Sequence, residues 1–133
     1  MNNYKILSPF YYDTPLSNHI ATELIEYLSG DRDVFTLPFT IRGTPFQQNV
    51  YQTLQAQVTY GQTISYKNLA LLAGYPKAAR AVGTAMKINP LPFIIPCHRV
   101  IRSNGNPGEY AMGASIKYFL LSLEKNFIPN SLH

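Results

Sequence analysis

Residues 64–90 read ISYKNLALLAGYPKAARAVGTAMKINP and carry the pattern of two short helices joined by a turn. Ser65 can cap a first helix over residues 66–73, and Gly74 ends it because glycine readily adopts the left-handed conformation found after helices. A second helix is expected over residues 77–87. Two helices around a glycine-containing turn predict a helix-turn-helix, a unit of DNA-binding proteins, although generic helix pairs of this kind are more common.

The second of these helices carries few side chains that could read a base sequence. Arg80 is the long side chain that projects from a nearly smooth face. Helices that read the major groove carry several long polar side chains, so this pattern favours a sequence-independent approach to the minor groove, with Arg80 inserted into the base stack. An alanine-rich helix that only packs against its neighbour is the alternative. The small residues of the face are Ala78, Ala79, Ala81, Gly83 and Ala85.

Two further helices are predicted before this unit. One is expected over residues 17–29, with Ser17 as its N-cap, and residues 31–43 follow as a short strand and a linker. Thr44 and Pro45 begin the other helix, because threonine is a good cap and proline suits the first helical position.

The chain after the unit is predicted to form short strands and one more helix. Residues 91–101, LPFIIPCHRVI, are apolar and interrupted by prolines, which predicts short strands around a turn. A last helix is expected over residues 114–125. One side of it is apolar and comprises Ile116, Phe119, Leu120 and Leu123. The expected fold is therefore mostly α with short strands.

Length and composition exclude several classes of protein. A chain of 133 residues is expected to have one core, and its 14% charged residues are too few for an intrinsically disordered chain. No apolar run is long enough to cross a bilayer. One cysteine excludes a disulfide framework and a cysteine-rich zinc site. These features predict a protein of a reducing compartment inside the cell, such as the cytoplasm.

Positive charge is concentrated in the later part of the chain. Residues 49–133 contain eight Lys and Arg against two Glu, whereas residues 1–48 contain three Lys and Arg against five acidic residues. This asymmetry is consistent with an anionic partner such as nucleic acid, and also with an ordinary solvated basic face.

The single cysteine, Cys97, lies in the tetrapeptide Pro-Cys-His-Arg. A nucleophilic thiolate requires a nearby base or cation, which His98 could supply. The alternative is a buried, inert cysteine. Glu124 on the last helix could orient the histidine, but a glutamate beside Lys125 is also typical of a surface ion pair.

Four segments together resemble the catalytic domain of the O6-alkylguanine-DNA alkyltransferases. They are TPFQQNVYQTL, ISYKNLALLAG, PKAARAVGTAMKINPLPFIIPCHRVI and GEYAMGASIKYFLLSLE, in family order between about Thr44 and Lys125. The resemblance implies an α+β fold with a winged-helix-like helix-turn-helix. It also implies that residues 44–133 are the catalytic and DNA-binding domain, and that residues 1–43 are a shortened N-terminal region and linker.

The resemblance implies direct DNA repair with the protein itself as the acceptor. The family extrudes the damaged guanine from the duplex and transfers an alkyl group, mainly methyl, from its O6 to a cysteine; O4 of thymine is a further possible substrate. Cys97 would be the nucleophile, His98 would take its proton through a water, and Glu124 would orient the imidazole. Tyr66 would hydrogen-bond N3 of the guanine. The thioether is not regenerated, so each molecule would act once.

The family's DNA contacts and base pocket also correspond to residues of this chain. Arg80 would fill the space left by the extruded base, and Tyr66 would displace the 3′ phosphate. Other DNA-facing residues would be Lys77, Ala78, Ala79 and Gly83. The pocket would comprise Asn89 as a hinge, the Val100 carbonyl, Tyr110, Ala111 and Met112. The implied partner is double-stranded DNA containing O6-alkylguanine. The protein is expected to act as a monomer, to use no metal or cofactor, and not to bind a membrane.

Two departures from the family accompany the resemblance. The region before Thr44 is shorter than the family's N-terminal domain and lacks the cysteines of its metal site. Met112 stands where glycine is usual, which predicts a smaller alkyl pocket that reacts poorly with a benzyl adduct.

Two rival functions are a lesion-binding protein without transfer activity and a helix-turn-helix regulator. In lesion-binding proteins of this kind the nucleophilic cysteine is replaced, often by tryptophan. This chain has Cys97 and no tryptophan. The second helix of the helix-turn-helix carries few side chains that could read a base sequence, which argues against the regulator.

Overall fold

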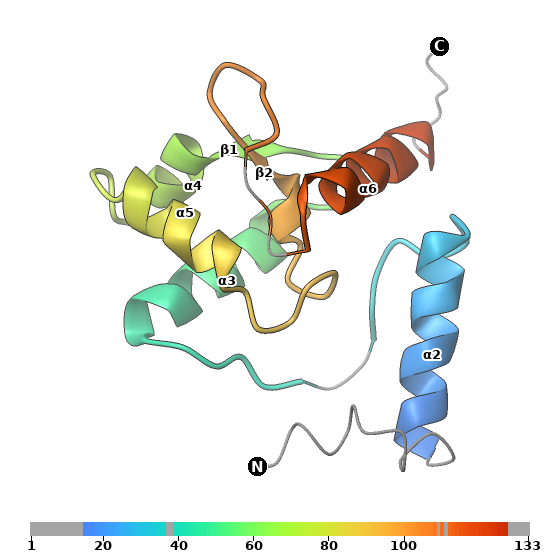
Figure 1. Cartoon of the computed structure of the whole chain (residues 1–133). Coiled ribbons are helices and arrows are strands. Elements are labelled where there is room, and N and C mark those ends of the chain that lie inside the picture. The colour runs from blue at the N-terminus through green and yellow to red at the C-terminus, as the bar shows by residue number, and fades with distance from the viewer. Residues whose placement is uncertain (1–14, 37–38, 109, 111, 128–133) are drawn as a thin grey trace. The chain divides into compact units, whose positions relative to one another are not determined.

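Figure 1 shows the computed structural model, which describes residues 15–36, 39–108, 110 and 112–127. The chain divides into two compact units, Met1–Phe39 and Thr40–His133. Within the described ranges, none of the helices combines the length and the apolar character that a membrane crossing requires.

Helix α2 (Pro15–Leu28) belongs to the first unit. It begins two residues before the predicted start, so Ser17 lies inside the first turn and the prediction that it caps the helix is wrong. Proline is well suited to begin the helix because the first helical N–H groups have no partner within the helix. Beyond its end, Gly30 has a φ of 83°, and its N–H donates to the carbonyl of Tyr27 over 3.1 Å.

Side chains hold the segment that follows α2. The strand predicted within residues 31–43 is absent from the described part of that range. Glu23 is 1% exposed and accepts hydrogen bonds from the N–H and the hydroxyl of Thr36. Arg32 binds Glu26, with Nε 2.8 Å from Oε1. Contacts to two carboxylates of the helix therefore replace strand pairing.

Helix α3 (Pro45–Gln57) begins the regular structure of the second unit, as the sequence predicts. Thr44 and Gln47 form a capping box, in which each side chain accepts a hydrogen bond from the backbone N–H of the other, over 3.1 and 3.0 Å. Val50, Tyr51 and Leu54 are buried on one face of α3 and form part of the core.

The predicted helix-turn-helix is present. The short strand β1 (Ile64–Ser65) leads into α4 (Tyr66–Leu72), and α5 (Ala79–Lys87) packs against α4. The Ser65 hydroxyl caps α4 by accepting from the N–H of Asn68 over 3.0 Å, and Gly74 has the predicted left-handed conformation. Helix α5 begins two residues later than predicted, because the chain first makes a turn closed by a bond from the N–H of Ala78 to the carbonyl of Tyr75.

A second strand joins distant parts of the chain. Strand β2 (Val100–Ile101) pairs in parallel with β1, with Ile64 opposite Val100. The three-residue helix η2 (Cys97–Arg99) precedes β2 directly. This pairing brings the helix that carries Cys97 and His98 close to the start of α4. The fold is mostly helical with a small two-stranded parallel sheet.

Helix α6 (Ala114–Phe127) ends the described chain, and its buried side differs from the prediction. Ile116 and Phe119 are 38% and 51% exposed, whereas Leu120 is fully buried as expected. The other fully or nearly fully buried side chains are Lys117 and Glu124. The helix thus turns two charged residues inward, where partners from other elements compensate the cost of burying them.

Candidate active site

Cys97 lies at the start of η2 and is fully buried. The side-chain amide of Asn89 donates from Nδ2 to Cys97 Sγ over 2.9 Å and to the carbonyl of Ile95 over 2.8 Å. The Oδ1 of Asn89 accepts from the N–H of Leu91 over 2.8 Å. Since Asn89 follows α5, one buried side chain connects the end of the helix-turn-helix to the turn that carries the cysteine.

Burial controls the resting protonation state of this cysteine. It raises the pKa of the Cys97 thiol to about 11, although the hydrogen bond from Asn89 and the positive charge of Lys117 act in the opposite direction. The thiol is therefore protonated at neutral pH, and forming the thiolate requires a base within the site.

His98, Arg99 and Glu124 form a buried charged cluster. His98 donates from Nε2 to Glu124 Oε2 over 2.7 Å, and Arg99 donates from Nε and Nη2 to the two carboxylate oxygens over 2.8 and 3.0 Å. Arg99 also donates from Nη1 to the carbonyl of Val58 over 2.9 Å. Glu124 is 2% exposed, so the alternative of a surface pair with Lys125 is wrong.

The cluster fixes the charge of each partner. Burial alone would raise the pKa of Glu124, but its bonds to His98 and Arg99 lower that pKa to about 2. Burial lowers the pKa of His98 despite the opposing effect of Glu124, so the imidazole is neutral at pH 7. Because Nε2 donates to the carboxylate, Nδ1 is the ring nitrogen that can accept a proton.

The ionised Glu124 leads to a stability prediction. Glu124→Gln should lower the free energy of unfolding at pH 7 by about 3 kcal/mol, because it leaves the buried Arg99 without its counter-charge. The pKa of this carboxyl rises from about 2 to its ordinary 4.5 on unfolding. Its contribution is therefore complete above pH 4.5 and is lost as the pH falls toward 2.

Urea unfolding from pH 7 to pH 3 tests this prediction. The difference between wild type and Glu124→Gln should narrow below pH 4.5, and a constant difference would contradict it. Glu26→Gln is the control, because Glu26 pairs with Arg32 at a partly exposed site, where such a pair contributes at most about 1 kcal/mol.

Lys117 is a site residue that the sequence reasoning missed. It is fully buried, donates from Nζ to the carbonyl of Val100 over 2.7 Å, and lies 5.7 Å from the ring centroid of Tyr66. Burial lowers the pKa of Lys117 to about 8, and the electrostatic effect of Cys97 acts in the opposite direction. The signal in the sequence was its spacing, since Lys117 lies seven positions before Glu124 on one side of a helix. Arg99 was also missed, although it is adjacent to His98.

Tyr66 lies at the start of α4, between α5 and the loop after β2. A Cβ on Gly83 of α5 would lie 3.9 Å from the Tyr66 ring. A Cβ on Gly108, which has a φ of 80°, would lie 2.6 Å from the phenol oxygen. Glycine at position 108 thus serves both the backbone conformation and the close approach to Tyr66.

A surface groove of about 460 Å³ contains several of the residues predicted to contact DNA. Nearby, Ala78 is half-buried and Lys77 is exposed in the turn before α5. The groove is lined by Tyr66, Ala79, Arg80, Gly83, Thr84, Lys87 and Arg102.

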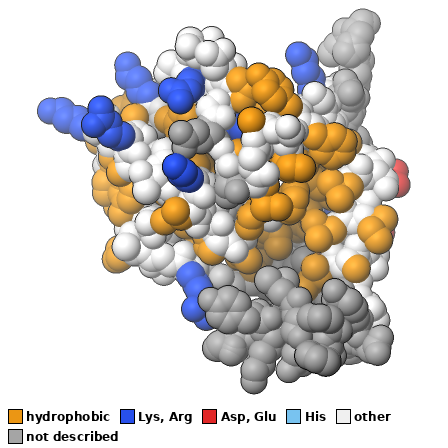
Figure 2. All heavy atoms as spheres, viewed as in Figure 1, with side chains coloured by type: hydrophobic (Ala, Val, Ile, Leu, Met, Phe, Trp, Pro, Cys, Tyr) orange, Lys and Arg blue, Asp and Glu red, His pale blue; other side chains and the backbone are white. Residues whose placement is uncertain are grey.

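Two of the eight basic residues counted in residues 49–133 do not contribute to the surface, because Arg99 and Lys117 are buried. The other six are exposed. Figure 2 shows several Lys and Arg side chains at the upper left of the face in view, where Figure 1 draws α4 and α5. The part of the surface that carries the groove is thus basic.

The predicted pocket residues have different surroundings. Val100 is buried, and Tyr110 is 6% exposed with its ring centroid 6.4 Å from that of His98. Met112 is 47% exposed, which differs from the enclosed position that a restriction on alkyl size requires. Ala111 lies outside the described residues. Among those residues, no group of three or more His, Cys, Asp or Glu is placed to hold a metal ion.

Comparisons with known proteins agree with this geometry. Residues 45–126 match the family described as "6-O-methylguanine DNA methyltransferase, DNA binding domain". The constitutive methylated-DNA–protein-cysteine methyltransferase of Bacillus subtilis is 46% identical over 114 residues, which are 85% of this chain and 68% of that protein. The Methanosarcina barkeri protein of the same name is 47% identical over 106 residues, covering 80% of this chain and 66% of its own length.

A solved structure gives the same result. Mycobacterium tuberculosis OGT in complex with DNA superposes with a TM-score of 0.81 at 40% identity, covering 87% of this chain and 71% of that one. The chain thus spans about two thirds of the length of these relatives. It belongs to the O6-methylguanine DNA methyltransferase family and is an enzyme of the class methylated-DNA–protein-cysteine methyltransferase.

Proposed function

We propose that this chain repairs DNA by moving a methyl group from O6 of guanine to Cys97 in a single, irreversible reaction. The observation that carries the proposal is the buried His98–Glu124 bond of 2.7 Å at the residue that follows Cys97, whose buried sulfur accepts a hydrogen bond from Asn89. These observations support roles for Cys97 as nucleophile, His98 as base and Glu124 as the carboxylate that orients the base, the combination that activates a weak nucleophile.

The proposed transfer balances without a cofactor. The thiol proton of Cys97 passes through a water to Nδ1 of His98, and Glu124 stabilises the resulting imidazolium. The sulfur attacks the methyl carbon, the bond between that carbon and O6 breaks, and the electron pair remains on the guanine. Tyr66 donates a hydrogen bond to N3 and so stabilises this leaving anion. Arg99 keeps Glu124 ionised throughout.

The damaged base must leave the duplex to reach the buried sulfur, at a cost of a few kcal/mol. Arg80, exposed on α5, is proposed to occupy the vacated space in the stack. The small residues Ala78, Ala79 and Gly83 allow α5 to approach the minor groove closely. We further propose that residues 44–133 carry this activity, that the protein acts as a monomer, and that it works wherever the cell keeps its DNA.

Intact-mass measurement after incubation with excess methylated duplex tests the proposal. The expected result is a gain of one methyl group per protein molecule, located on Cys97 by peptide mapping, followed by no further product. Product beyond one equivalent would refute the single reaction. Binding of the methylated duplex without any mass gain would favour the lesion-binding protein. A strong binding preference for one undamaged sequence would favour the regulator.

The position of Met112 leads to a prediction about the size of the alkyl group. Met112→Gly should change the ratio of the O6-benzylguanine rate to the methyl-repair rate by no more than about twofold, because substitutions at exposed positions have small energetic effects. If Met112 narrowed the alkyl pocket, as the sequence predicts, the change in this ratio would be larger. The two second-order rate constants are compared in wild type and variant, and a tenfold rise in the ratio would show that Met112 borders the pocket.

A further inference from the structure

Helix α5 presents an ordered face to the groove. Five of the lining residues belong to α5, and their spacing of three and four places them in one stripe along the helix: Ala79, Arg80, Gly83, Thr84 and Lys87. Between the cations Arg80 and Lys87 lie Gly83, which has no side chain, and Thr84, whose side chain is small. Lys87 lies seven positions after Arg80, which is about 10 Å along the helix axis. The middle of the stripe is therefore a shallow depression, and a positive charge lies on each side of it.

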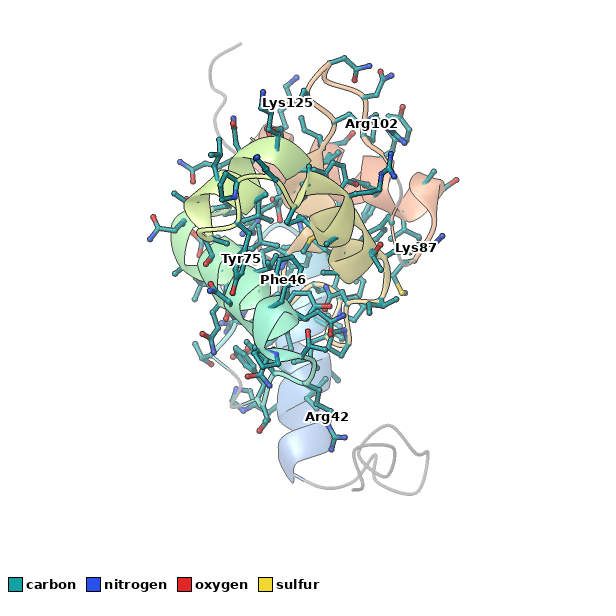
Figure 3. All side chains as sticks on the ribbon, turned by 90° about the vertical axis from the view of Figure 1, so that its left-hand side faces the viewer. Arg42, Phe46, Tyr75, Lys87, Arg102 and Lys125 are labelled. Atoms are coloured by element: carbon teal, nitrogen blue, oxygen red, sulfur yellow. The ribbon has the colours of Figure 1, made fainter. Side chains whose placement is uncertain are left out.

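The other wall of the groove supplies a third cation. Arg102 follows β2 and is exposed. It lines the same groove as Lys87, and Figure 3 shows both side chains on the same side of α5. Strand pairing holds this wall in place, because β2 pairs with β1 and β1 leads directly into Tyr66.

The charge of the groove selects the chemistry of its ligand. Three of its seven lining residues are cationic, and none of those seven is acidic. Burial is the main cause of the lowered pKa of Lys117, and the nearby positive charge of Arg102 lowers that pKa further. An extended anion that passes close to Tyr66 fits these features, and a sugar–phosphate backbone is such an anion.

We propose that Lys87 and Arg102 form a two-sided clamp on the phosphates of the strand that carries the extruded nucleotide. The inference rests on the proposed function, in which Arg80 enters the base stack and is not available to hold the backbone. Lys87 then binds a phosphate from the α5 side and Arg102 binds one from the opposite wall. The clamp holds the strand while the base is out of the duplex.

The salt dependence of binding to an undamaged duplex tests the clamp, measured by fluorescence anisotropy with wild-type protein and single variants. Lys87→Gln and Arg102→Gln should each reduce the slope of log affinity against log salt by about 0.9, the value for one lost phosphate contact. Lys125→Gln is the matched control, because it removes one exposed positive charge from α6, away from the groove. Its slope should equal that of wild type.

Transfer kinetics provide a second readout. Both groove variants should require about five- to tenfold more methylated duplex for half-maximal rate, and should react with free O6-methylguanine base at the wild-type rate. Wild-type slopes in both variants, or an equal change in Lys125→Gln, would overturn the clamp. A slower reaction of Arg102→Gln with the free base would also overturn it, by showing that the residue acts on the pocket. Failure of the proposed function is distinct, since wild type itself would then accept no methyl group.

Discussion

Cys97→Ala is expected to abolish methyl transfer completely while leaving affinity for methylated duplex within about twofold of wild type. The substitution removes the sulfur that receives the methyl group. It leaves the exposed groove beside α5 unchanged, because Asn89 still donates to the carbonyl of Ile95 and still joins the end of α5 to the active-site turn. Transfer is measured as labelled methyl on protein, and binding as anisotropy of a labelled duplex.

Cys97→Ser is the matched control for this experiment. Its hydroxyl can accept the hydrogen bond that Asn89 gives to the sulfur, so any effect of the small cavity in the alanine variant is removed. Serine should also fail to accept methyl, because a hydroxyl is far harder to ionise than a thiol and is a weaker nucleophile. Residual transfer in either variant would mean that another side chain is the acceptor. Loss of binding in both would show that Cys97 is needed for the fold.

Arg80→Ala is expected to slow repair of duplex DNA by about 100-fold and to leave the reaction with free O6-methylguanine base unchanged. Base extrusion costs a few kcal/mol, and each 1.4 kcal/mol that Arg80 no longer supplies slows the reaction about tenfold. The side chain is exposed, and its backbone carbonyl keeps the bond from the Thr84 hydroxyl, so the helix should be unaffected.

A single-stranded substrate distinguishes extrusion from simple binding. Because its bases are unpaired, the loss for Arg80→Ala should be smaller on single strands than on duplex. Lys125→Ala again controls for charge and should react like wild type on all three substrates. Equal losses on duplex, single strand and free base would mean that Arg80 has a structural role and would contradict the prediction.

The sequence predicted the elements whose signals are local. Thr44 and Pro45 before α3, and Ser65 and Gly74 around α4, act on backbone groups within three or four residues, so the structure has these boundaries where the sequence places them. Where the local signal was weaker, the start of α5 was misplaced by two residues. The family resemblance likewise rested on short segments in a fixed order.

The catalytic residues could also be predicted in part from short sequence motifs. The order of motifs pointed to Cys97, His98 and Glu124, and the structure places the last two within 2.7 Å of each other, although they are 26 positions apart. It also excludes a surface position for Glu124. Composition could not distinguish basic residues on the surface from those inside, so Arg99 and Lys117 were counted with the exposed ones.

The amino-acid sequence by itself determined the N-caps of α3 and α4, the helix-turn-helix, and the family to which the chain belongs. Only the tertiary structure decided that β1 pairs with β2, that α6 buries Lys117 and Glu124 together with Leu120, and that Arg102 shares a groove with α5. The physical reason is the range of the interactions. Caps and turns depend on neighbouring residues, whereas strand pairing, the burial of a charge and the walls of a groove depend on partners that only folding brings together.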